Sequence, residues 1–160
     1  MRAVLLFALI AAAVFAALGW RAGHEPDAPV SDAVMLRPDD ARLTERGRQI
    51  YMAHCAACHG VQLEGQPDWR VRRADGRLPA PPHDAGGHTW HHADELLFRI
   101  TKHGVGPASG LPDYDSAMPA YAGVLSDEEI VAVLSWIKSQ WPADVRALHD
   151  QVNARTRHGG

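Results

Sequence analysis

The chain has 160 residues, of which 46% are hydrophobic and 22% charged, and its formal net charge is −3 at pH 7. This length favours one domain, and this composition is typical of a globular protein. The weakly negative charge excludes a surface built to bind nucleic acid.

The N-terminus has the pattern of an export signal. Arg2 gives a short positive region, residues 3–20 form an uninterrupted apolar run, and small residues precede a suitable cleavage point after Gly19. The run is also at the lower length limit of a bilayer-spanning helix. We therefore expect residues 1–20 to be a signal peptide or an N-terminal membrane anchor, and either one places the rest of the chain in the periplasm.

Domain boundaries follow from the composition after the leader. Residues 21–38 contain three prolines and scattered charges without a helical period, which predicts a flexible tether. The folded domain is expected over residues 39–141. Residues 142–160 form a C-terminal tail in which Val145, Leu148 and Val152 have the spacing of a short helix.

The first predicted helix covers residues 39–55. Its apolar and small residues recur at three- and four-residue spacing, at Leu43, Gly47, Ile50 and Tyr51. A glycine inside a helix costs about 1 kcal/mol relative to alanine. Gly47 therefore predicts a second helix that approaches this one closely.

A Cys-Ala-Ala-Cys-His motif follows at residues 55–59. This spacing is the attachment signature of c-type haem, in which two thiols form thioethers with the haem vinyl groups. The histidine next to the second cysteine is then placed to ligate the iron. Two alternatives remain open: Cys55 and Cys58 as a redox-active pair, or as half of a zinc site completed by histidines.

Two segments rich in glycine and proline, residues 61–87 and 104–125, are predicted to be loops. Connections of this length are unusual in a compact domain unless something other than the chain organises them, which a haem would do. A second helix is predicted between them over residues 93–103, ended by Gly104. A third helix, residues 127–140, begins with a Ser126–Glu129 capping box.

Met118 is the candidate for the second axial ligand of the iron. Of the other methionines, Met1 lies in the leader, Met35 in the tether, and Met52 one turn before Cys55 on the proximal helix. Met118 lies in the second long loop, where the following proline favours an extended backbone. A thioether opposite histidine raises the reduction potential of haem iron.

A group of histidines offers an alternative ligand or a further metal site. One of these side chains can replace Met118 as the sixth ligand, several can bind copper, and all can instead be solvated loop residues. The group consists of His83, His88, His91, His92 and His103.

Together the Cys-x-x-Cys-His helix, the Met-Pro pair in a late loop and the closing helix resemble the class I monohaem cytochromes c over residues 39–141. The resemblance implies an all-α fold in which the N- and C-terminal helices pack together and long loops wrap one covalent haem c. It further implies that Gly47 and Tyr51 pack against Val133 and Trp136.

The resemblance also assigns roles around the haem. Cys55 and Cys58 would carry the thioethers, and His59 and Met118 would be the axial ligands. The carbonyl of Pro81 or Pro82 would hold the His59 imidazole. Trp90 would donate its N–H to a haem propionate or serve as a core residue, and Tyr121 would pack at the haem edge. The relatives usually have an apolar residue near the position of His83.

These expectations describe an exported, monomeric electron carrier that exchanges single electrons with redox partner proteins and makes or breaks no bonds. Three alternatives remain open. The chain can be the haem subunit of a dehydrogenase or oxidase complex, or a peroxidase or gas sensor with an open sixth position. It can also be a metal-handling protein that uses the histidine group.

Overall fold

The computed structural model describes residues 34–111 and 113–158, which contain α-helices and loops and no β-strand. The all-α prediction is confirmed. The elements are α2 (Ala41–His54), α3 (Ala56–His59), the 3-10 helix η1 (Thr89–His91), α4 (Asp94–His103), α5 (Val105–Ala108), α6 (Asp127–Ser139) and α7 (Ala143–His158).

The predicted leader, residues 1–20, and most of the predicted tether lie outside the described residues. None of the helices in the described part combines the length and the apolar character that crossing a bilayer requires. The leader therefore stays a prediction.

Helix α2 begins at a side-chain cap and presents one apolar face. The Asp40 carboxylate accepts hydrogen bonds from the backbone N–H groups of Arg42 and Leu43, at 3.1 and 3.0 Å, and so satisfies two donors that have no partner inside the helix. The buried residues of α2 are Leu43, Gly47, Ile50 and Tyr51.

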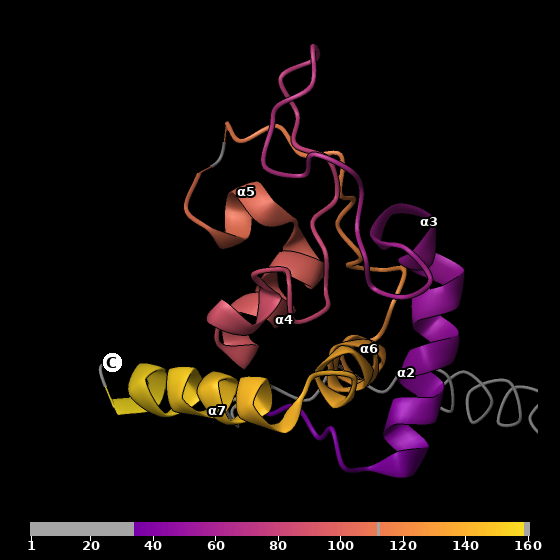
Figure 1. The fold of residues 1–160 in the computed structure, drawn as a ribbon, viewed down its shortest axis with the longest axis vertical. Helices are drawn as coiled ribbons and strands as arrows, with labels where there is room; N and C mark the ends of the chain where they lie inside the picture. The colour runs from indigo at the N-terminus through magenta and orange to yellow at the C-terminus, as the bar shows by residue number, and fades with distance from the viewer. Residues whose placement is uncertain (1–33, 112, 159–160) are drawn as a thin grey trace, which may run out of the picture. The chain divides into compact units, whose positions relative to one another are not determined.

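The core lies where α2 crosses α6, which Figure 1 shows side by side. Gly47 packs directly against the backbone of Ala132 and the β-carbon of Trp136. The rings of Tyr51 and Trp136 lie 4.6 Å apart. Most of α6 is buried because its apolar face is wide. The helix starts with the predicted capping box, in which Ser126 and Glu129 satisfy each other's backbone N–H groups.

The edges of the folded unit differ from the sequence expectation. The compact unit begins at Val34 rather than at Asp39. The Leu36 N–H donates to Asp94 of α4 at 2.9 Å, and the Arg37 N–H donates to Ser135 of α6 at the same distance. Composition does not predict these backbone contacts, because a segment rich in proline and polar residues has the same composition whether it is a free tether or packs on the domain.

The C-terminal tail is a long helix that belongs to the same unit. In Figure 1, α7 lies across the end of the molecule next to η1 and α4. His149 is fully buried, and Asn153 exchanges hydrogen bonds with Asp94, donating to its carboxylate at 3.0 Å and accepting from its N–H at 2.8 Å. The segment predicted as a loop over residues 104–125 also contains the short helix α5.

Candidate haem site

The cysteine–histidine motif forms a tight joint at the end of α2. The chain leaves α2 at His54, turns at Cys55 and continues into the single turn of α3. The backbone N–H groups of Cys58 and His59 both donate to the Cys55 carbonyl, at 3.1 and 2.9 Å. Both thiols and the imidazole are therefore held within one turn. Cys55 is half-buried, Cys58 is exposed, and both are free thiols.

The surroundings of Cys55 bear on the alternative of a redox-active cysteine pair. Burial, with a smaller contribution from neighbouring Cys58, raises the pKa of Cys55 to about 11. Cysteines that attack disulfides have lowered pKa values, because the thiolate is the nucleophile. Burial therefore disfavours Cys55 as the attacking thiol of a redox-active pair.

His59 is buried and oriented by one hydrogen bond. Its Nδ1 lies 2.8 Å from the Pro81 carbonyl oxygen. A carbonyl can only accept, so Nδ1 carries the proton and Nε2 keeps its lone pair. Burial lowers the pKa of His59, and the hydrogen bond to Pro81 opposes the shift in part. The result is a neutral imidazole with a fixed tautomer and Nε2 available as a metal ligand.

Two glycines brace the segment that holds His59. Both lie in the segment that was predicted to be a loop over residues 61–87. A β-carbon on Gly65 would lie 2.5 Å from the Pro82 nitrogen, and one on Gly87 would lie 2.1 Å from the Pro82 carbonyl oxygen. Gly65 also has a φ of +69°, which favours glycine. The only sequence signal for this role is that both glycines lie in the same loop as the proline pair.

Met118 lies in the loop between α5 and α6 and packs, half-buried, against the hydrophobic core. Tyr121 ties this loop to the motif, because its hydroxyl donates to the His54 carbonyl at 2.7 Å, next to Cys55. The Tyr121 N–H donates to the backbone carbonyl of Thr101 in α4 at 3.1 Å. Met52, by contrast, is an exposed residue of α2.

The indole N–H of Trp90 donates to the Ala85 carbonyl at 3.3 Å, and the ring stacks on His91 at 3.6 Å. The propionate contact that the resemblance implies for Trp90 stays a prediction. To form it, the indole N–H would have to give up or share its bond to Ala85.

The histidine group divides into separate contacts. The His83 ring stacks on His59, the His88 ring stacks on Trp69, and the His92 ring meets His88 edge-on. Burial lowers the pKa of His83, His88 and His92. His103 is exposed at the end of α4. Over residues 34–111 and 113–158, no three His, Cys, Asp or Glu side chains are grouped so that they would hold a metal ion.

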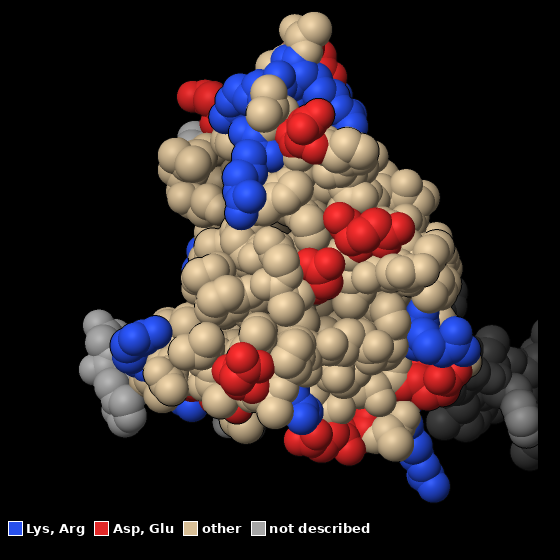
Figure 2. All heavy atoms as spheres, in the orientation of Figure 1, with Lys and Arg blue, Asp and Glu red and all other residues tan. Residues whose placement is uncertain are grey.

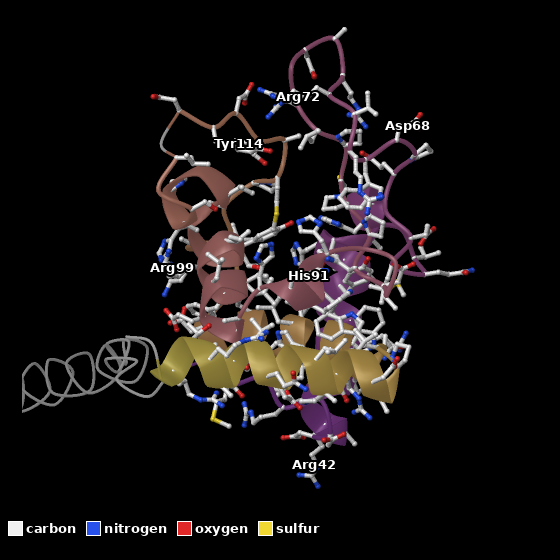
Figure 3. The ribbon with its side chains drawn as sticks, turned by 60° about the vertical axis from the view of Figure 1, so that its left-hand side comes forward. Arg42, Asp68, Arg72, His91, Arg99 and Tyr114 are labelled. Atoms are coloured by element: carbon white, nitrogen blue, oxygen red, sulfur yellow. The ribbon has the colours of Figure 1, made fainter. Side chains whose placement is uncertain are left out.

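Arginines gather on the long loop between α3 and η1, where Figure 2 shows basic atoms concentrated at the upper tip. Arg77 forms an ion pair with Asp115 at 2.9 Å. Figure 3 shows Arg72 and Tyr114 facing each other, with the guanidinium 5.8 Å from the ring centre. Both contacts join the loop after the cysteine motif to the loop that carries Met118.

Comparison with known proteins decides the family. The family model described as cytochrome c matches residues 44–141. The chain belongs to the cytochrome c family. This cytochrome c is also 29% identical over 107 residues to a cbb3-type cytochrome c oxidase subunit, FixPc, of Rhizobium leguminosarum bv. viciae. That match covers 64% of the chain but only 29% of the relative. No solved structure matches the chain.

The residues of the site fit the group that the family carries. Members of this family bind haem c covalently, and the present chain offers two free thiols within one helical turn and a buried neutral imidazole with Nε2 available. The thiols and the imidazole are therefore those that covalent attachment of haem c in a cytochrome c requires.

Proposed function

We propose that this cytochrome c carries one electron at a time between redox partner proteins in the periplasm, with one haem bound through Cys55 and Cys58 and ligated by His59 and Met118. Haem iron supplies the one-electron change between its ferrous and ferric states. The carrier makes and breaks no bonds and acts as a monomer. It is either soluble or attached to the membrane through residues 3–20.

The observation that carries the proposal is the state of His59. Its Nδ1 donates to Pro81, its ring is buried, and its burial disfavours protonation. These contacts hold the nitrogen that would bind iron unprotonated and in one orientation. A ligand held in this way needs little rearrangement when the charge at the site changes, which suits a carrier that accepts and releases electrons.

The contacts of the Met118 segment support Met118 as the second axial ligand, opposite His59. Two hydrogen bonds from Tyr121 hold the end of this segment, one to α4 and one to the end of α2 beside the motif. Pro119 restricts the backbone of Met118. The thioether is therefore offered from a loop that is fixed at a point next to Cys55.

Replacing the proposed ligand tests the function. Met118→Ala in the haem-loaded protein is expected to abolish the sulfur-to-iron charge-transfer band of the oxidised form and to lower the reduction potential. Its reduced form is expected to bind carbon monoxide. Met52→Leu is the matched control, because Met52 is exposed on α2, and it is expected to change none of these properties.

Three results would count against the proposal. An unchanged spectrum and potential in Met118→Ala would exclude Met118 as the ligand, with His103 and His91 the next candidates. Carbon monoxide binding by the unmodified reduced protein would favour a sensor or peroxidase with an open sixth position. Turnover of hydrogen peroxide would likewise favour an enzyme.

A second candidate function rests on the similarity to the oxidase subunit. The chain spans 29% of the length of that relative, so a role as a haem subunit of an oxidase complex is a proposal of the same electron chemistry with a fixed partner. Co-purification from solubilised membranes under native conditions would favour the subunit. Recovery as a lone species in the periplasmic fraction would favour the free carrier.

A further inference from the structure

His83 has a contact that neither the family fold nor the proposed ligand set uses. Its imidazole stacks on the imidazole of His59, with ring centres 3.9 Å apart and ring planes inclined by 20°. The chain places this residue two positions after Pro81, whose carbonyl holds His59 Nδ1. One short stretch thus meets His59 twice, at its nitrogen and across its face.

The His83 ring is itself anchored by a directed hydrogen bond. The Thr89 hydroxyl donates to the Pro82 carbonyl at 3.4 Å, so the Thr89 oxygen is left to accept from His83 Nδ1, which lies 2.8 Å away. Thr89 is buried. The His83 ring therefore has a fixed tautomer and a fixed direction.

The backbone of His83 is held as firmly as its side chain. Its N–H donates to the Leu63 carbonyl at 2.8 Å, and its carbonyl accepts from the indole N–H of Trp141 at 2.7 Å. Tyr51 meets the ring edge-on at 6.4 Å. These contacts come from α2, from the loop after α3 and from the end of α6, so the position of His83 is set by the whole core.

The hydrogen bond at Nδ1 and the bond to Cβ fix the direction of the His59 imidazole but leave the tilt of the ring plane less restricted. A flat ring stacked on its face removes this freedom, whereas an aliphatic side chain would fill the same space without defining a plane. We propose that His83 is a positioning residue that sets the plane of the His59 imidazole, with Thr89 holding the His83 ring in place. This inference rests on the proposed role of His59 as a haem ligand.

The test uses haem-loaded, oxidised protein and reads the orientation of the ligand directly. Electron paramagnetic resonance g-values and the proton shifts of the haem methyl groups both depend on the direction of the imidazole plane. His83→Leu is expected to shift both sets of signals while the sulfur-to-iron band persists. His83→Phe, which restores a flat ring, is expected to return them toward the unmodified values.

Thr89→Val tests the anchor without touching either imidazole. It is expected to shift the same signals in the same direction as His83→Leu, by a smaller amount. Thr101→Val is the matched control, since Thr101 is equally buried but donates to Leu97 inside α4. It is expected to leave the g-values and methyl shifts unchanged.

Unchanged signals in His83→Leu would overturn the proposal, as would equal shifts in His83→Leu and His83→Phe. If His83→Leu fails to bind haem, Thr89→Val becomes the deciding variant. Unchanged g-values and methyl shifts in Thr89→Val would then overturn the proposal. Failure of the proposed function looks different: the unmodified protein would then lack the low-spin His–Met signals. If the unmodified protein shows the low-spin His–Met signals and the variants merely leave them unchanged, only the role of His83 is overturned and the proposed function stands.

Discussion

Gly47 of α2 and Ala132 of α6 are in backbone contact: a β-carbon on Gly47 would lie 2.0 Å from the Ala132 carbonyl oxygen and 2.6 Å from its carbonyl carbon. Such a distance is far inside van der Waals contact, and the nearest atoms belong to a helix backbone that cannot turn away. The crossing of the two helices that enclose the core therefore depends on the absence of a side chain at position 47.

Gly47→Ala is accordingly expected to lower the free energy of unfolding by about 1–3 kcal/mol, the range for overpacking a close-packed core. Helix propensity alone predicts the opposite sign, because alanine favours a helix by about 1 kcal/mol over glycine. Denaturant titration of the haem-loaded protein measures the difference. Gly86→Ala, where a β-carbon would meet only Asp84 at 3.3 Å, is the control and is expected to have a small effect. A stabilised Gly47→Ala protein would contradict the crossing.

The helices α2, α4 and α6 were predictable to within two residues because their signals are local. Asp40 and Ser126 cap α2 and α6, and Gly104 ends α4 with a φ of +88°. Gly47 also predicted a close helix approach, and the family resemblance identified the last helix as the partner. Each of these features depends on neighbours in the sequence or on a periodicity that one helix displays by itself.

What the sequence did not predict depends on distant partners. The packing of Leu36 on Asp94 spans 58 residues, and the docking of Asn153 on Asp94 spans 59. The stacking of His83 on His59 is of the same kind, since His83 lies in a loop 24 residues after His59 and only the fold brings the two rings together. The family resemblance left Pro81 and Pro82 open as the acceptor for His59, and the hydrogen bond in the structure is to Pro81.

Covalent attachment of haem is the most direct chemical prediction. Cys55 and Cys58 are held in one helical turn as free thiols, so haem is expected to stay with the polypeptide through acidic, denaturing extraction. Replacing either cysteine by serine should give unstable or haem-free protein. Mass spectrometry of the intact chain counts the attached groups. Partition of the haem into the organic phase would contradict the attachment.

Folding is expected to depend on haem. The long loops at residues 61–87 and 109–126 contribute few buried apolar side chains with which to offset the entropy of ordering them. The haem-free chain should therefore lack a cooperative thermal transition in circular dichroism. A cooperative thermal transition of the haem-free protein with full helix content would contradict this prediction, because the α2–α6 pair would then be sufficient for folding without haem.

The capping box of α6 offers a small, local test of the core. Ser126→Ala removes the acceptor for the Glu129 N–H and is expected to lower the free energy of unfolding by about 1 kcal/mol. Glu129→Gln keeps an oxygen for the Ser126 N–H, so a smaller loss is expected. Equal losses in both variants, measured by denaturant titration, would mean that the Glu129 charge, which also pairs with Arg46, contributes as much as the Ser126 cap.

His149 of α7 predicts a dependence of stability on pH. Its Nε2 donates to the His92 carbonyl at 3.0 Å and lies 3.4 Å from the Asp94 carboxylate, whereas its buried Nδ1 has no hydrogen-bond partner among the described residues. A second proton would therefore occupy a site without an acceptor. Burial lowers the pKa of His149, and the positive charge of Lys138 adds to this, while Asp94 and Asp150 oppose it.

The sign of the effect follows from this lowered pKa. Below about pH 6.5 the unfolded chain binds a proton at position 149 that the folded protein does not. The contribution of neutral His149 to stability is therefore complete above that pH. It is lost progressively as the pH falls toward the lowered pKa of the folded state. His149→Gln keeps a donor for the His92 carbonyl but cannot titrate, so its free energy of unfolding should fall less steeply between pH 7 and pH 5. His103→Gln, at the exposed end of α4, is the control and should match the unmodified protein. An identical slope in His149→Gln and the unmodified protein would place the acid sensitivity elsewhere.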